Sequence, residues 1–183
     1  MLAWIIARID TGQSGFFTQD RIGRHGRPFR IRKIRTMKPV AGFITTVTTD
    51  KDPRITRIGR VLRRMKIDEL PQLYNVLIGD MSIVGPRPEV RSYVDLLSDD
   101  DRVILTVRPG ITGPASLKYR DEAALLARVA DPEQYNREVL YPDKIRINRA
   151  YVQNLSLIAD AGYVWQTFKI ALFGNSKGRR SGE

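Results

Sequence analysis

The sequence predicts an α+β fold, a helix-rich single domain with a small β-sheet and amphipathic helices on its surface. The chain has 183 residues and is 42% hydrophobic, which is enough for one core and falls within the usual size of one domain. Short apolar stretches bounded by glycines near the start predict strands and tight turns. The longer stretches that follow carry apolar residues at helical spacing.

The first fifty residues predict short elements. The first apolar run, residues 1–7, is far shorter than the roughly 20 residues that span a bilayer. Residues 1–9 therefore fit either a helix packed on the core or the end of a longer membrane segment. Short strands are expected around Phe16 and Phe17, between turns at Gly12, Gly15, Gly23 and Gly26. Residues 29–37 show neither a clean strand nor a clean helix, and residues 40–50 favour a loop or an edge strand.

Residues 53–66 predict a basic amphipathic helix, with Asp52 as its cap and Pro53 at its first position. Its apolar side consists of Ile55, Ile58, Val61, Leu62 and Met65, and arginines occupy the other sides. Such a helix is either an ordinary surface helix packed on the core or one that faces phosphate groups or lies at a membrane interface.

Several helices and one strand are predicted downstream. A helix runs from about residue 69 to residue 78 and is stopped by Gly79, and residues 82–84 form a strand. Further helical stretches are expected at 89–97 and at 121–129, and two more follow Pro132 and Pro142, the last of them at about 157–172. In the last of these, core packing is the favoured explanation for the apolar stripe of Ile158, Ala161, Trp165, Phe168 and Leu172. Residues 174–183 are polar and predicted to be disordered.

The positive charge of the chain is concentrated in one segment. The formal net charge is +11, but residues 21–66 alone carry 15 Lys and Arg against Asp50 and Asp52, a local net charge of +13. A field of this kind selects nucleic acid, an anionic membrane surface or phosphorylated small molecules. A basic nucleic-acid-binding module is therefore an alternative, although no helix-turn-helix signature, aromatic RNA-binding motif or zinc-finger spacing accompanies the charge.

The absence of cysteine and the presence of a single histidine exclude several classes of site. The chain has no cysteine, so it has neither disulfides nor thiolate metal sites, and a cytoplasmic environment is the simpler expectation. Its one histidine, His25, has no second histidine with which to share a metal or build a hydrolase triad, and a structural or solvated role is favoured for it.

The most informative segment is residues 66–88. Asp68 and Glu69 are adjacent carboxylates that could serve simply as helix-capping residues. They follow the strongly basic helix, however, and precede Arg87, which stands between two prolines. A carboxylate attacks a diphosphate only when the repulsion is neutralised, usually by Mg²⁺ and by Arg or Lys. The rigid backbone around Arg87 suits a bidentate grip on phosphate oxygens, while a surface ion pair is the alternative.

Several ordered motifs resemble the bacterial sugar transferases, also called monotopic phosphoglycosyl transferases. The matching segments are residues 15–23, 29–37, 68–88 and 108–113, together with the pair Asp160 and Thr167. The resemblance implies that residues 10–173 form the catalytic domain. It also implies that residues 1–9 are the remnant of a truncated N-terminal re-entrant membrane helix.

The resemblance further implies the transfer of a sugar-1-phosphate from a UDP-sugar to polyprenyl (undecaprenyl) phosphate, with release of UMP. Asp68 would attack the β-phosphorus and form an aspartyl phosphosugar. Glu69 would assist, either as a Mg²⁺ ligand together with Asp68 or by keeping the lipid phosphate deprotonated. Arg87 would hold the nucleotide or its phosphates, and further anion contacts are expected from Lys33, Arg35 and Arg63.

The same resemblance places the protein at the cytoplasmic face of the bacterial inner membrane, at the first membrane step of a glycoconjugate pathway. Anionic lipid would attract the basic helix, at about 1 kcal/mol per Lys or Arg near the surface. The apolar residues Trp165 and Phe168 would add to this contact. The identity of the sugar and the oligomeric state stay open at this stage.

Overall fold

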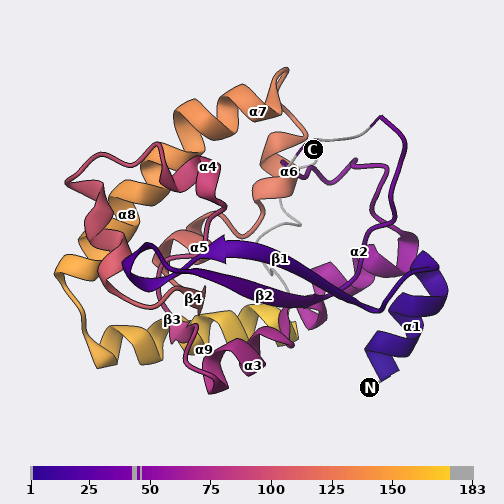
Figure 1. Cartoon of the computed structure of the whole chain (residues 1–183), viewed down its shortest axis with the longest axis horizontal. Helices are drawn as coiled ribbons and strands as arrows, with labels where there is room; N and C mark the ends of the chain where they lie inside the picture. Colours follow the sequence, from indigo (N-terminus) through magenta and orange to yellow (C-terminus); the bar gives the residue numbers. More distant parts are fainter. Residues whose placement is uncertain (1, 43–44, 46, 174–183) are drawn as a thin grey trace, which may run out of the picture.

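The computed structural model describes residues 2–42, 45 and 47–173 (Figure 1). Within these residues, nine α-helices surround two small two-stranded sheets, as expected for a helix-rich α+β chain. The predicted disorder of residues 174–183 lies outside the described residues.

The first sheet is an antiparallel hairpin of β1 (Phe16–Ile22) and β2 (Pro28–Ile34). It confirms the strand expected around Phe16 and resolves the ambiguous segment 29–37 as mostly strand. The connecting turn contains exposed His25 in the left-handed region, with φ of 58°, which agrees with a solvated role for this side chain.

The second sheet pairs β3 (Ser82–Val84) with β4 (Gly110–Thr112) in parallel. The two backbones come so close that a Cβ on Gly110 would lie 2.1 Å from the amide nitrogen of Gly85, so both positions need glycine. Gly110 also donates its N–H to the carbonyl of Pro86 at 2.8 Å. The sheet thereby fixes the chain just before Arg87.

Helix α1 (Leu2–Thr11) both packs on the core and exposes apolar side chains. Ala7 is fully buried against Ile34 and Leu62, while Leu2 and Ile9 are exposed. Among the described residues, no helix has the length and apolar character needed to cross a membrane. The re-entrant membrane helix therefore stays a prediction.

Helix α2 (Arg57–Arg64) begins later than the sequence suggests. Thr56 is its cap and accepts the N–H of Gly59 at 2.8 Å. Asp52 does not cap it, because its carboxylate is held by the side chain of Arg54 at 2.7 Å. Most of the predicted apolar side is exposed rather than packed on the core, namely Ile58, Val61 and Met65.

The predicted helix from residue 69 to residue 78 is divided. A 3₁₀ turn (Ile67–Glu69) precedes α3 (Gln72–Leu77), which ends before Gly79, whose φ is +85°. The expected helix at 89–97 shortens to α4 (Arg91–Val94), because Ser98 begins a new turn by accepting the N–H of Asp101.

The second half of the chain is helical, as predicted, but in shorter pieces. The 3₁₀ helix Asp101–Thr106 precedes β4, and α5 (Pro114–Lys118) and α6 (Glu122–Leu126) follow it. Helix α7 (Pro132–Tyr135) leads through a π turn into α8 (Tyr141–Gln153). The largest core cluster joins α8 to the hairpin and to α4, through Ile22, Val94, Leu97, Ile104, Tyr141 and Ile145.

Helix α9 (Leu157–Phe173) confirms the predicted element but not its packing. Three residues of its apolar stripe are exposed, at 87% for Ile158, 58% for Trp165 and 52% for Phe168, so core packing is the wrong explanation for them. The helix is instead attached by its polar side. The hydroxyls of Thr112 and Thr167 lie 2.6 Å apart, and Tyr151 donates its hydroxyl to Asp160 at 2.9 Å.

Candidate active site

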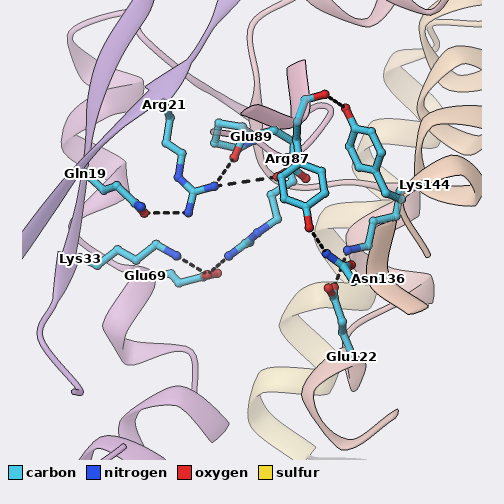
Figure 2. A network of polar contacts seen from close by, with 12 residues as sticks. Gln19, Arg21, Lys33, Glu69, Arg87, Glu89, Glu122, Asn136 and Lys144 are labelled. Atoms are coloured by element: carbon cyan, nitrogen blue, oxygen red, sulfur yellow. Dashed lines mark hydrogen bonds and ion pairs between the residues drawn. The ribbon is translucent and has the colours of Figure 1, made fainter. Parts of the chain in front are cut away.

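A buried ion-pair cluster joins three segments that are distant in sequence (Figure 2). Oε1 of Glu69 lies 2.7 Å from Nη2 of Arg87 and 3.4 Å from Nζ of Lys33. Lys33 comes from β2, Glu69 from the 3₁₀ turn and Arg87 from the loop after β3. The structure thus brings together three of the residues singled out in the sequence.

The local fold explains why two carboxylates turn inward here. The chain reverses at Lys66, a non-glycine residue with φ of 58°, directly after α2. Ile67 then packs against the core cluster of Ala7, Ile34 and Leu62. Since this contact draws the 3₁₀ turn into the interior, Asp68 and Glu69 are only 7% and 8% exposed.

The neighbouring cations control the ionisation of Glu69. Burial alone would raise its pKa, but Arg87 and Lys33 reverse this effect and hold the pKa well below its usual range. Glu69 in turn raises the pKa of Arg87. Burial and the proximity of Arg87 lower the pKa of Lys33 to about 8, although Glu69 acts in the opposite direction. The cluster therefore contains an ionised carboxylate and a lysine that titrates near physiological pH.

Asp68 differs from Glu69 because it forms no ion pair with a Lys or Arg side chain of the described residues. Burial raises the pKa of Asp68, and so does the charge of Glu69, while Lys33, Arg63 and Lys66 lower it. Its Oδ1 is buried and has no hydrogen-bond partner among the described residues. A buried acceptor without a partner is costly, by about 1–3 kcal/mol, and is typical of a position completed by an ion or a ligand.

Asp68 fits a Mg²⁺ ligand better than Glu69 does. Within the described chain, no group of three or more His, Asp or Glu side chains forms a metal cage. Mg²⁺ in phosphate-handling sites, however, commonly takes one or two carboxylates and completes its shell with phosphate oxygens and water. Oδ1 of Asp68 accepts no hydrogen bond from the described residues and can make such a bond, whereas Oε1 of Glu69 already accepts from Arg87 and Lys33.

The two remaining predicted anion contacts are placed differently. Arg63, on α2, lies close enough to Asp68 to lower the pKa of that carboxyl. The guanidinium of Arg35 instead donates to the carbonyls of Ser14 and Phe16, at 2.8 and 3.3 Å. The structure does not bring Arg35 into the ion-pair cluster, because these bonds tie it to the start of β1.

Arg21 belongs to the site but was not singled out in the sequence. It donates to the carbonyl of Pro88 at 3.3 Å and to the side chain of Gln19 at 2.8 Å, and it pairs with Glu89 at 3.9 Å (Figure 2). Arg21 thereby connects β1 to the loop that carries Arg87. Its position within the motif at residues 15–23 was the available signal, but one arginine among many in a basic segment did not stand out.

A buried acidic pair beside a lysine and several arginines suits an enzyme that acts on anionic, phosphorylated substrates. A family model described as "Bacterial sugar transferase" matches residues 1–174. The chain therefore belongs to the bacterial sugar transferase family, and the enzyme class expected from the sequence, phosphoglycosyl transferase, is confirmed.

Named relatives support this assignment. Exopolysaccharide production protein ExoY of Sinorhizobium fredii is 34% identical over 183 residues, covering 91% of this chain and 74% of the relative. The UDP-N-acetylgalactosamine-undecaprenyl-phosphate N-acetylgalactosaminephosphotransferase of Aeromonas hydrophila is 35% identical, covering 93% and 38%. The undecaprenyl-phosphate galactose phosphotransferase of Salmonella typhimurium is 32% identical, covering 88% and 34%. The chain thus spans little more than a third of the length of the latter two.

Proposed function

We propose that this protein transfers a sugar-1-phosphate from a UDP-sugar to undecaprenyl phosphate at a membrane surface. The observation that carries the proposal is the buried, unpartnered Oδ1 of Asp68, beside a carboxylate that Arg87 and Lys33 neutralise. The names of the relatives supply the substrate class, since the Aeromonas and Salmonella proteins are named for undecaprenyl phosphate. The reaction would open a polysaccharide or other glycoconjugate pathway at the cytoplasmic face of the membrane.

The proposed chemistry proceeds in two displacements at one phosphorus atom. In the first, a carboxylate oxygen of Asp68 bonds to the β-phosphorus while the bond from that phosphorus to the bridging oxygen breaks, and the electron pair leaves with UMP. In the second, a phosphate oxygen of undecaprenyl phosphate bonds to the same phosphorus and the carboxylate of Asp68 departs. The product is an undecaprenyl diphosphate sugar, and no proton is gained or lost when the lipid phosphate is fully ionised.

Arg87 and Lys33 would hold the diphosphate during both steps. A guanidinium has five N–H donors, and Glu69 occupies one nitrogen of Arg87. The remaining donors are available for phosphate oxygens, and Glu69 keeps the guanidinium oriented while they bind. The ammonium of Lys33 adds a second positive charge from β2.

Mg²⁺ is the proposed cofactor. Oδ1 of Asp68 would hold it together with diphosphate oxygens, and Glu69 is the neighbouring second carboxylate. Bound there, the ion would supply charge neutralisation for the attacked diphosphate. Its charge would also oppose the raised pKa of Asp68, favouring the ionised nucleophile.

Exposed apolar side chains support a membrane location. Helix α3 exposes Leu73, Tyr74 and Leu77, and α9 exposes Leu157, Ile158, Trp165 and Phe168. Both helices contact β3, and Figure 1 shows them along the same lower edge of the molecule. Apolar patches of this kind mark interaction sites, and the arginines of α2 suit anionic headgroups. We therefore propose an anionic membrane surface as the partner.

The test is release of UMP from UDP-sugars, with Mg²⁺ and undecaprenyl phosphate supplied in detergent. We expect turnover with at least one UDP-sugar, and we expect Asp68→Asn to abolish it because an amide is not a competent nucleophile. Asp143→Asn is a matched control, since Asp143 is an ion-paired carboxylate on α8 outside the cluster. Normal turnover by Asp68→Asn would overturn the covalent mechanism.

A further inference from the structure

Asn75 is the most completely buried polar side chain near the site, with an exposed fraction of 0%. It lies in α3, six residues after Glu69. Its Nδ2 donates to the carbonyl of Arg30 at 2.8 Å and to Oδ2 of Asp80 at 3.2 Å. Its Oδ1 accepts the backbone N–H of Arg32 at 3.2 Å. Every polar group of this amide is therefore bonded within the fold.

The bonds to Arg30 and Arg32 occupy the free edge of β2. In the hairpin, Gly23 donates its N–H to the carbonyl of Arg27, and paired residues along β1 and β2 alternate between bonded and non-bonded positions. By this alternation, the backbone groups of Arg30 and Arg32 point away from β1. A third strand paired to this edge would offer a donor to the carbonyl of Arg30 and an acceptor to the N–H of Arg32. The side chain of Asn75 supplies both, so it continues the sheet in place of a strand.

This contact joins the two segments that supply the cluster. Arg32 directly precedes Lys33 on β2, and Asn75 lies within α3, the helix that follows the 3₁₀ turn ending at Glu69. Sliding α3 along β2 by one residue would exchange the bonded backbone groups for ones that face β1. The amide therefore holds α3 in a single register against β2.

We propose that Asn75 is a positioning residue, which sets the separation between Lys33 and Glu69 by locking the edge of β2 to α3. Its catalytic consequence rests on the proposed function, because the ion-pair cluster is what it aligns. Asn75 touches no reacting atom in this account. It acts through Lys33, whose Nζ lies 3.4 Å from Oε1 of Glu69.

Neither aspartate nor alanine can replace all three hydrogen bonds of the Asn75 amide. Aspartate would keep an acceptor for Arg32 but would place a carboxylate against the carbonyl of Arg30 and the carboxylate of Asp80. Alanine would leave the carbonyl of Arg30 and the N–H of Arg32 without this partner. A backbone group of β2 that loses this partner makes local opening of the strand edge more favourable.

Hydrogen exchange tests whether Asn75 holds the edge of β2 to α3, and it does so without requiring turnover. In Asn75→Ala, we expect the Arg32 amide to exchange at least about tenfold faster, since a loss of 1.4 kcal/mol in local opening free energy is a factor of ten. Amides of residues 29–34 and 67–75 should loosen together, while those of α8 keep their protection. Asn148→Ala, at another buried asparagine, on α8, is the control and should leave residues 29–34 unchanged. Unchanged protection of Arg32 in Asn75→Ala overturns the proposal, whether or not the protein releases UMP.

A double-mutant cycle tests the link to Lys33. We expect Asn75→Ala to lower kcat at least about tenfold in the native background and less than about twofold in a Lys33→Met background, because residues that act through one another are not additive. Equal losses in both backgrounds would show a general structural role and overturn the positioning role. If Asn75→Ala does not fold, Asn75→Leu replaces it in both tests, because it keeps about the size of the side chain and makes none of the three hydrogen bonds. Absence of UMP release from the native protein would refute the proposed function. The hydrogen-exchange result would then decide whether Asn75 holds α3 to the edge of β2.

Discussion

Glu69 and Arg87 form a 2.7 Å ion pair between the 3₁₀ turn after α2 and the loop after β3. Lys33 shares the same oxygen of Glu69, so one carboxylate offsets part of the charge of two cations. A buried cation left without a partner is costly, and this pair allows the site to hold positive charge before a phosphate arrives. Changes to Arg87 or Lys33 are therefore expected to alter how this site binds phosphate groups.

Replacing Arg87 by lysine separates the contribution of its positive charge from that of its planar guanidinium group. Arg87→Lys keeps a cation near Glu69 but loses the planar fork that binds two oxygens. We expect kcat/KM for UDP-sugar to fall about tenfold to a hundredfold, while the midpoint of urea unfolding changes little. Arg149→Lys, an ion-paired arginine on α8, serves as the control and should leave kcat/KM unaffected. An unchanged kcat/KM for Arg87→Lys would mean that Arg87 contributes charge alone.

The lowered pKa of Lys33 predicts an alkaline limit to activity. Burial and Arg87 bring this pKa to about 8, from an ordinary value of 10.5. As pH rises through 8, Lys33 loses the charge that would hold the diphosphate, so kcat/KM should decline there. The profile of Lys33→Met should be lower but flat over the same range. A decline near pH 8 that persists in Lys33→Met would assign it to another group.

The lowered pKa of Lys33 also predicts how the stability of the folded protein changes with pH. Because its pKa is lower in the folded protein than in the unfolded chain, the unfolded chain binds more protons between pH 8 and 10.5. The contribution of Lys33 to the free energy of unfolding therefore rises with pH across this window. Urea unfolding measured at several pH values between 8 and 10.5 should show the free energy of unfolding rising more steeply with pH in the native protein than in Lys33→Met.

The sequence predicted the elements whose signals are local. Gly79 ended a helix and residues 82–84 formed a strand, because positive φ and β-branched runs are properties of a few residues. Packing was less predictable. The apolar stripe of α9 has the spacing of a core helix, and only the tertiary structure shows that Thr167 faces β4 while Trp165 faces outward.

The sequence singled out residues of the cluster where one short segment carries them. Asp68, Glu69 and Arg87 stand within a single stretch of sequence, and Glu69 and Arg87 form an ion pair in the structure. Arg35 and Arg21 show the limit of this approach. Both lie in the basic segment, but Arg21 on β1 bonds to the carbonyl of Pro88, whereas Arg35, after β2, bonds to the carbonyl of Ser14 just before β1. Charge density does not distinguish them, because these contacts depend on strand pairing.

The exposed stripe of α9 predicts how the protein binds lipid. Trp165→Glu combined with Phe168→Glu should reduce binding to vesicles containing anionic lipid at least about tenfold, since it removes apolar area and adds negative charge. Unfolding should change little, because both side chains are more than half exposed. Val139→Glu, an exposed apolar residue outside α3 and α9, is the matched control. Equal vesicle binding by the double variant would exclude this face of α9 as the lipid contact.

The left-handed backbone at Lys66 predicts a stability difference between two small substitutions. Its φ of 58° is unfavourable for a residue with a Cβ and is required for the reversal that places Asp68 and Glu69. Lys66→Gly and Lys66→Ala remove the same charge, so the difference between them isolates the backbone. We expect Lys66→Gly to be more stable than Lys66→Ala by about 1 kcal/mol in urea unfolding, although glycine usually destabilises. Both variants lose a charge that lowers the pKa of Asp68, so both should require a higher pH for half-maximal activity on the acid side. A more stable Lys66→Ala would show that the left-handed turn is absent in solution.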